Sequence, residues 1–145
     1  MITIQHGDVD IGALIEQAKQ PEIGGIVVFD GIVRDDDILA MELEAYEEVA
    51  VPELQRIADE ATAEYGLLSV DIVHRIGRLD IGENILVIVA AAGHRKEAFA
   101  GCEYILERIK ESVPIWKKEH YADGEARWVA CHCAQPEAVG GGELR

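Results

Sequence analysis

Positive charge is scarce in this sequence of 145 residues. Lys and Arg number 13 against 28 Asp and Glu, so the formal net charge is −15 at pH 7. Non-specific binding to nucleic acid or to an anionic membrane needs a broad basic surface. The composition therefore argues against both kinds of partner.

Long apolar runs and cysteines are also few. No apolar run reaches the roughly 18 residues of a membrane span. Residues 1–8 lack the charge, the apolar stretch and the cleavage site of a signal peptide. Three cysteines, Cys102, Cys131 and Cys133, are an odd number that fits a reducing compartment better than a disulfide framework. We therefore expect a cytoplasmic protein.

The remaining composition is that of an ordinary globular protein. Hydrophobic residues make up 49% and charged residues 28% of the chain. The length suggests one domain with a substantial core. We expect this domain to span residues 1–134, with residues 135–145 as a loose C-terminal tail that contains three consecutive glycines.

Hydrophobic periodicity predicts an α+β fold. Strands are expected over residues 2–4, 25–33, 41–46, 70–76, 84–92, 115–120 and 126–132, and helices over 10–19, 51–65 and 95–111. Residues 77–83 are expected to form a turn-rich link, and Asp123-Gly124 to turn a C-terminal β-hairpin. The predicted architecture is a mixed sheet covered by the two longer helices. The buried face of the helix over 95–111 is expected to contain Ala98, Phe99, Cys102, Ile105, Leu106 and Ile109.

Six of the thirteen cations lie in one segment of 24 residues. They are Arg95, Lys96, Arg108, Lys110, Lys117 and Lys118. Four glutamates share the segment, so salt bridges on a helix surface would also explain the cluster. Charge alone does not decide between these explanations.

Two shorter stretches could bind anions. Arg34 ends an apolar strand, where its guanidinium could grip a phosphate or carboxylate at the sheet rim. From that stretch alone, pairing with Asp35 or Asp37 is the more economical explanation. His94 and Arg95 stand at a strand-to-helix junction, where backbone N–H groups and the helix dipole favour anions. A histidine helix cap explains that stretch equally well.

Lys110 and Lys117 form the most suggestive pair. Lys110 is in the last turn of a predicted helix, and Lys117 follows seven residues later, beyond the corner that Pro114 makes. Two ammonium groups that converge there would lower each other's pKa. A lysine tuned in this way can act as a nucleophile or a proton carrier near neutral pH. Trp116 could supply an apolar wall that excludes water.

Two other polar stretches receive structural interpretations. His74 and Arg75 alternate on a predicted strand, and we expect them to face neighbouring strands. Cys131-His132-Cys133 lacks the second pair of ligands that a zinc site needs. We therefore expect packing thiols there and predict no metal site.

Seven stretches together resemble the large, catalytic subunit of molybdopterin synthase. In order they are F-D-G-I-V-R (29–34), L-E-A-Y-E (43–47), V-H-R-I-G (73–77), G-H-R-K-E-A-F (93–99), E-Y-I-L-E-R-I-K (103–110), V-P-I-W-K-K-E (113–119) and R-W-V (127–129). The resemblance implies an α/β-hammerhead-like fold. It also implies an activity: two sulfurs are inserted into cyclic pyranopterin monophosphate as the dithiolene of molybdopterin. The sulfur would arrive as a thiocarboxylate on the C-terminal glycine of a small ubiquitin-like subunit, in a heterotetramer built on a central dimer of large subunits.

The resemblance also assigns residues, and no cofactor. Lys110 and Lys117 match the family's essential lysines, and its substrate-binding positions match Ile32, Val33, Arg34, His94, Arg95, Lys118 and Glu119. Arg95 and Lys110 lie fifteen residues apart on one predicted helix, or ~22 Å along its axis. We therefore expect His94 and Arg95 to reach the site from the other subunit of a dimer. A non-catalytic module that binds an anion or docks a ubiquitin-like protein is the alternative.

Overall fold

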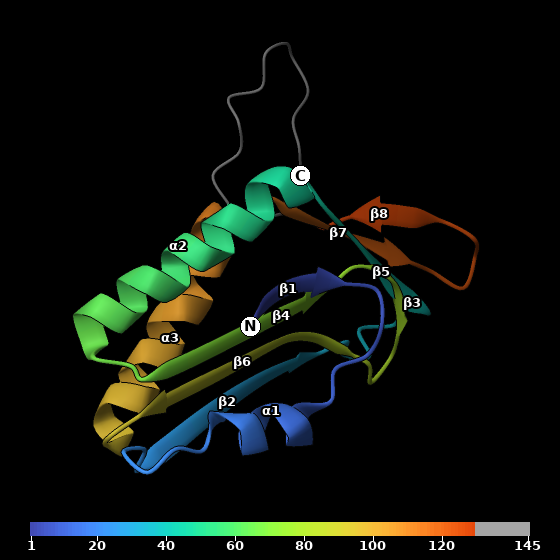
Figure 1. Ribbon diagram of the computed structural model, residues 1–145. Coiled ribbons are helices and arrows are strands. Elements are labelled where there is room, and N and C mark those ends of the chain that lie inside the picture. Colours follow the sequence, from blue (N-terminus) through green and yellow to red (C-terminus); the bar gives the residue numbers. More distant parts are fainter. Residues whose placement is uncertain (130–145) are drawn as a thin grey trace.

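Two four-stranded β-sheets and three helices make up the computed structural model, which describes residues 1–129 (Figure 1). The first sheet has the order β1-β4-β6-β2, and β1 is parallel to β4 whereas the other pairs are antiparallel. Its strands are β1 (Ile2–Gln5), β4 (Ser69–Arg75), β6 (Asn84–Ala92) and β2 (Gly25–Ile32). The second sheet is antiparallel, with the order β5-β3-β7-β8. Its strands are β5 (Gly77–Asp80), β3 (Ala40–Ala45), β7 (Ile115–His120) and β8 (Ala126–Trp128).

The two longer helices, α2 (Glu47–Tyr65) and α3 (Arg95–Ser112), lie side by side over one face of the mixed sheet (Figure 1). Between them and the sheet is the main core, where Leu54, Ile57, Ile88 and Ile105 are fully buried. The short helix α1 (Ile11–Ala18) covers the opposite face, where Leu14 and Ala18 join a second apolar cluster with residues of β4 and β6. The sheet is therefore covered on both faces, as its run of apolar residues in β6 requires.

Helix ends follow local chemistry. Asp10 caps α1, since its carboxylate accepts a hydrogen bond from the N–H of Ala13 at 3.0 Å. Gly66 ends α2 in the left-handed conformation, with φ of 66°, which glycine adopts without strain. The helix α2 begins at Glu47, four residues earlier than expected, because it continues through Pro52.

The predicted α+β class, the two covering helices and the C-terminal hairpin are confirmed. The strands divide into two sheets, however, and the expected link over 77–83 contains β5. That strand was missed because only Leu79 among its four residues is strongly apolar, and its stability comes from pairing with β3.

The prediction that Phe99 is buried is wrong. Its side chain is 62% exposed, whereas Ala98 and Cys102 on the same helix are buried. Phe99 was expected to be buried because it is aromatic, but its position on the helix lies at the margin of the apolar stripe. Other expectations fall on residues 130–145, outside the described part of the chain: the end of the last strand, the Cys131-His132-Cys133 stretch and the tail over 135–145.

Candidate active site

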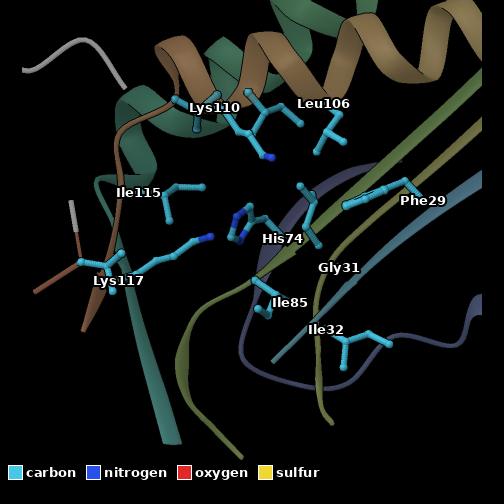
Figure 2. Close-up of a pocket in the computed structure, with 13 residues that line it drawn as sticks. Phe29, Gly31, Ile32, His74, Ile85, Leu106, Lys110, Ile115 and Lys117 are labelled. Carbon is cyan, nitrogen blue, oxygen red and sulfur yellow. The ribbon is translucent and has the colours of Figure 1, made fainter. Parts of the chain in front are cut away.

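A cavity of about 360 Å³ lies where α3 meets both sheets (Figure 2). Its wall is mostly apolar, and among the described residues three titratable side chains interrupt it: His74 from β4, Lys110 from α3 and Lys117 from β7. The apolar part of the wall is made by Phe29, Ile32, Ile85, Leu86, Leu106, Ile109, Val113, Ile115 and Val129. The space is therefore suited to a small molecule with an anionic group and a flat or apolar body.

The chain brings the two lysines together by a sharp corner. Lys110 is in the last turn of α3, the helix ends at its cap residue Val113, and Pro114 leads directly into β7. Alternation along β7 places Ile115 and Lys117 on the cavity side. Figure 2 shows the terminal nitrogens of Lys110 and Lys117 directed into the same space.

The described part of the chain does not neutralise the charges of the two lysines. None of the residues from 1–129 that line the cavity is acidic. Within residues 1–129, neither Lys110 nor Lys117 takes part in an ion pair. Burial lowers the pKa of Lys117, and the nearby charge of Lys110 lowers it further. An anion that enters the cavity would therefore relieve an unfavourable concentration of positive charge.

His74 is the residue that sequence analysis missed. Its side chain stands between the two amino groups in Figure 2, and the residue is 4% exposed. Its Nδ1 lies 2.9 Å from the carbonyl oxygen of Arg75. Burial lowers the pKa of His74 to about 4, and the charge of Lys117 acts in the same direction. The available signal was a polar residue on the face of β4 that also carries Val70 and Ile72.

The stretch from Ile32 to Arg34 is only partly at the cavity. Ile32 lines it and is 50% exposed, whereas Val33 is buried in the main core. Arg34 is exposed and its Nε lies 3.0 Å from the carboxylate of Asp36. The structure thus shows an arginine paired with an aspartate of its own loop, although the partner is Asp36 and not Asp35 or Asp37.

Lys118 and Glu119 do not line the cavity either. Lys118 points to the other side of β7, where its Nζ lies 5.4 Å from the centre of the Trp128 ring. Glu119 is half-buried, and its carboxylate accepts a hydrogen bond from the Tyr121 hydroxyl at 3.4 Å.

His94 and Arg95 are separated from the lysine pair within one chain. Both are exposed at the beginning of α3, and Lys110 is in its last turn. Fifteen residues of helix correspond to ~22 Å. His94 occupies the N-cap position, but its side chain makes no capping hydrogen bond.

Metal ligation and thiol chemistry find no support in residues 1–129. No group of three or more His, Cys, Asp or Glu side chains in that range could hold a metal ion. Cys102 is buried, and burial raises the pKa of its thiol to about 11, which makes it unreactive. No helix in the same range is long and apolar enough to cross a membrane.

Comparisons with known proteins agree on one family. Residues 4–112 match the family model described as MoaE protein. The molybdopterin synthase catalytic subunit of Rhizobium meliloti is 39% identical over 142 residues, which are 94% of this chain and 92% of that protein.

Solved structures give the same result. The crystal structure of molybdopterin synthase from Staphylococcus aureus matches with a TM-score of 0.84 and 36% identity, over 89% of this chain and 96% of that one. A protein–protein complex of subunits 1 and 2 of molybdopterin-converting factor from Helicobacter pylori 26695 matches with a TM-score of 0.76 and 26% identity, over 88% of each chain. With most of its length matched by the family model and by relatives of this similarity, the chain belongs to the MoaE family.

Proposed function

We propose that this chain is the catalytic subunit of a molybdopterin synthase. It transfers sulfur from the thiocarboxylated C-terminus of a small ubiquitin-like subunit to cyclic pyranopterin monophosphate. The relatives that bear this name support the activity, and the Helicobacter pylori complex of two subunits supports the need for a partner. A cytoplasmic location is part of the proposal, in keeping with the free thiol of Cys102.

The observation that carries the proposal is the unneutralised lysine pair. In a protein with a net charge of −15, two lysines share a cavity to whose lining residues 1–129 contribute no carboxylate. Both reactants of the proposed reaction are anionic, one a thiocarboxylate and the other a cyclic phosphate. Further negative charge develops as sulfur is transferred. Preorganised cations in a partly dehydrated site stabilise such charge more than water does.

The two lysines have different surroundings and therefore different proposed roles. Lys110 is the more exposed, so we assign it the activation of the incoming thiocarboxylate, or attack on it, and proton transfer. Lys117 is half-buried and its pKa is lowered, so it can give up a proton closer to neutral pH. We assign Lys117 charge stabilisation and proton transfer. The apolar wall limits the access of water, which would hydrolyse a thiocarboxylate.

A second copy of the chain completes the proposed site. His94 and Arg95 are too far along α3 from Lys110 to contact one small pterin together with it. We infer that they serve the site of the neighbouring subunit in a homodimer, and that one small subunit binds at each end. The remaining proposed contacts are those of Ile32, Val33, Arg34, Lys118 and Glu119, through side chains or backbone.

The test is reconstitution from purified components. The protein, mixed with the thiocarboxylated small subunit and cyclic pyranopterin monophosphate, is expected to yield molybdopterin, measured as its fluorescent oxidation product. Lys110→Ala should lower the rate of product formation at least about 100-fold, because the developing charge loses a direct cationic contact. Urea unfolding should show that the variant remains folded.

Lys19→Ala is the matched control, because Lys19 is an exposed lysine that follows α1 and pairs with Glu16. This variant should retain full activity. Full activity of Lys110→Ala would contradict the proposed role of the lysine. Binding of both reactants by the wild-type protein without turnover would instead favour the non-catalytic docking module.

A further inference from the structure

His74 lies in the cavity and has no role in the reaction as proposed so far. Within residues 1–129, the charged groups that face its ring are Lys110 from α3 and Lys117 from β7 (Figure 2). Its neighbours in the sheet are apolar, Leu86 on β6 and Ile4 on β1.

The adjacent Arg75 directs its guanidinium elsewhere. It donates hydrogen bonds to the carbonyl oxygens of His6 and Asn84 and to the carboxylate of Glu83. The imidazole therefore faces two cations and no acid among the described residues.

The hydrogen bond at Nδ1 determines the tautomer of His74. A backbone carbonyl can only accept, so the Nδ1 atom at 2.9 Å from the Arg75 oxygen must carry the hydrogen. In the neutral ring, Nε2 then holds a lone pair and can only accept. Within residues 1–129, Nε2 makes no hydrogen bond. A buried ring with a fixed orientation thus offers one acceptor beside two ammonium groups.

We propose that His74 is a positioning residue for the lysine pair: its Nε2 accepts a hydrogen bond from the Lys117 ammonium and directs that group into the cavity. Figure 2 shows the Lys117 amino group beside the ring, and hydrogen bonds of this kind commonly tighten only when substrate binds. The ring is held by its bond to Arg75 and by burial, so the flexible partner is the one that moves.

Neutrality is what suits an imidazole to this task. An aspartate or glutamate would hold the lysine equally well, but it would neutralise the charge and repel an anionic substrate. A neutral acceptor orients Lys117 and leaves both positive charges available. The catalytic purpose of this role rests on the proposed function. The hydrogen bond itself can be tested without turnover, through the pKa values of Lys117 and His74.

A pair of substitutions separates the acceptor from the rest of the ring. In His74→Gln the side-chain amide reaches the position of Nε2 and keeps an acceptor there. In His74→Asn the shorter amide reaches the position of Nδ1, so it can still bond to the Arg75 carbonyl but leaves Lys117 without an acceptor. Urea unfolding establishes that both variants are folded.

The first measurement is the pKa of Lys117, followed by NMR of the lysine side chain. Loss of a hydrogen bond to the charged form should lower this pKa further in His74→Asn and leave it near the wild-type value in His74→Gln. In the reconstituted reaction, kcat should fall at least about tenfold in His74→Asn and be largely kept in His74→Gln. Equal pKa values of Lys117 in the two variants and the wild type would overturn the proposal.

The reciprocal measurement leaves His74 in place. In Lys117→Met, removal of the lysine charge should raise the pKa of His74 above about 4, while burial keeps it below the ordinary 6.5. An unchanged pKa of His74 would show that the two groups do not interact and would overturn the proposal. If both pKa changes occur but the wild-type protein makes no molybdopterin, the positioning role stands and the proposed function fails.

Discussion

Lys117 is costly for the fold, and the cost has a defined pH dependence. Its pKa in the folded protein lies below the ordinary 10.5 of an unfolded chain. Below the folded-state pKa, both states bind the proton and the cost of a charged lysine in the cavity is fully present. Between the two pKa values only the unfolded state binds the proton, so the free energy of unfolding rises with pH through that window.

Replacement of Lys117 by Met should therefore stabilise the protein at pH 7, by about 1 kcal/mol, the usual gain when a functional but unfavourable group is removed. The rise in the free energy of unfolding as pH approaches 10.5 should become shallower. Urea unfolding at a series of pH values measures both effects. Lys110→Met serves as the comparison. Because Lys110 is exposed, this substitution should change the free energy of unfolding by less than about 0.5 kcal/mol. A less stable Lys117→Met variant would contradict this account of the cavity.

Individual residues were predictable where local chemistry decides their place. The proximity of Lys110 and Lys117 could be predicted from a helix end, a proline and strand alternation. All three signals lie within a few residues of the lysines. His74 was missed because its partner elements, α3 and β7, lie more than 20 positions along the chain and a lone histidine carries no sign of what faces it. The pairing of Arg34 with Asp36 was nearly anticipated, since three aspartates follow the arginine directly.

At the scale of elements, the residues that lead into β2 and α3 approach each other closely at Gly24 and Gly93. Gly24 precedes β2, and its N–H donates to the Ala92 carbonyl at 3.0 Å. A Cβ on Gly24 would overlap the backbone carbonyl of Gly93, the residue just before His94. Backbone cannot yield there as a flexible side chain could, so this contact positions the start of α3.

Gly24→Ala should destabilise the protein by about 1–3 kcal/mol, since the backbone of Gly93 must shift. Gly7→Ala is the matched control, because a Cβ on Gly7 would meet nothing within 4 Å and stability should change by less than about 0.5 kcal/mol. The difference in urea midpoint between the two variants measures the effect. Equal midpoints would show that the segment around Gly93 adjusts freely.

Most elements could be anticipated from their own residues, and their grouping could not. The helices α1 and α3 and the strand β6 have strong periodicity or strong apolar character, so their existence was plain. The strand β5 depends on its partner β3, and the division into two sheets depends on register between distant segments. Such long-range pairing is hard to predict from the four residues of β5, of which only Leu79 is buried.

At the scale of the whole molecule, the proposed dimer makes a quantitative prediction. If Arg95 serves the neighbouring subunit's site, Lys110→Ala and Arg95→Ala chains should each be inactive alone. A mixed dimer would contain one intact site, formed by Lys110 of one chain and Arg95 of the other. Random exchange of subunits makes half the dimers mixed, so activity should recover to about a quarter of the wild-type value.

Reconstitution after mixing and subunit exchange measures this recovery. A double variant, Lys110→Ala with Arg95→Ala in one chain, is the control, because its mixture with the Lys110→Ala chain contains no intact site. Recovery in the first mixture alone supports shared sites. Absence of recovery, with mixed dimers demonstrated by mass spectrometry, would place Arg95 and Lys110 in the same chain's site or in separate functions.

The cavity is walled by both sheets, and this has a consequence for the life of the chain. Lys110 is carried by a helix on the mixed sheet, whereas Lys117 is carried by a strand of the antiparallel one. An intermediate in synthesis or unfolding that has formed only one sheet holds one amino group and no pocket. Under the proposed function, catalytic competence would therefore appear only once both sheets have formed, and an immature chain would not consume the thiocarboxylate of the proposed partner.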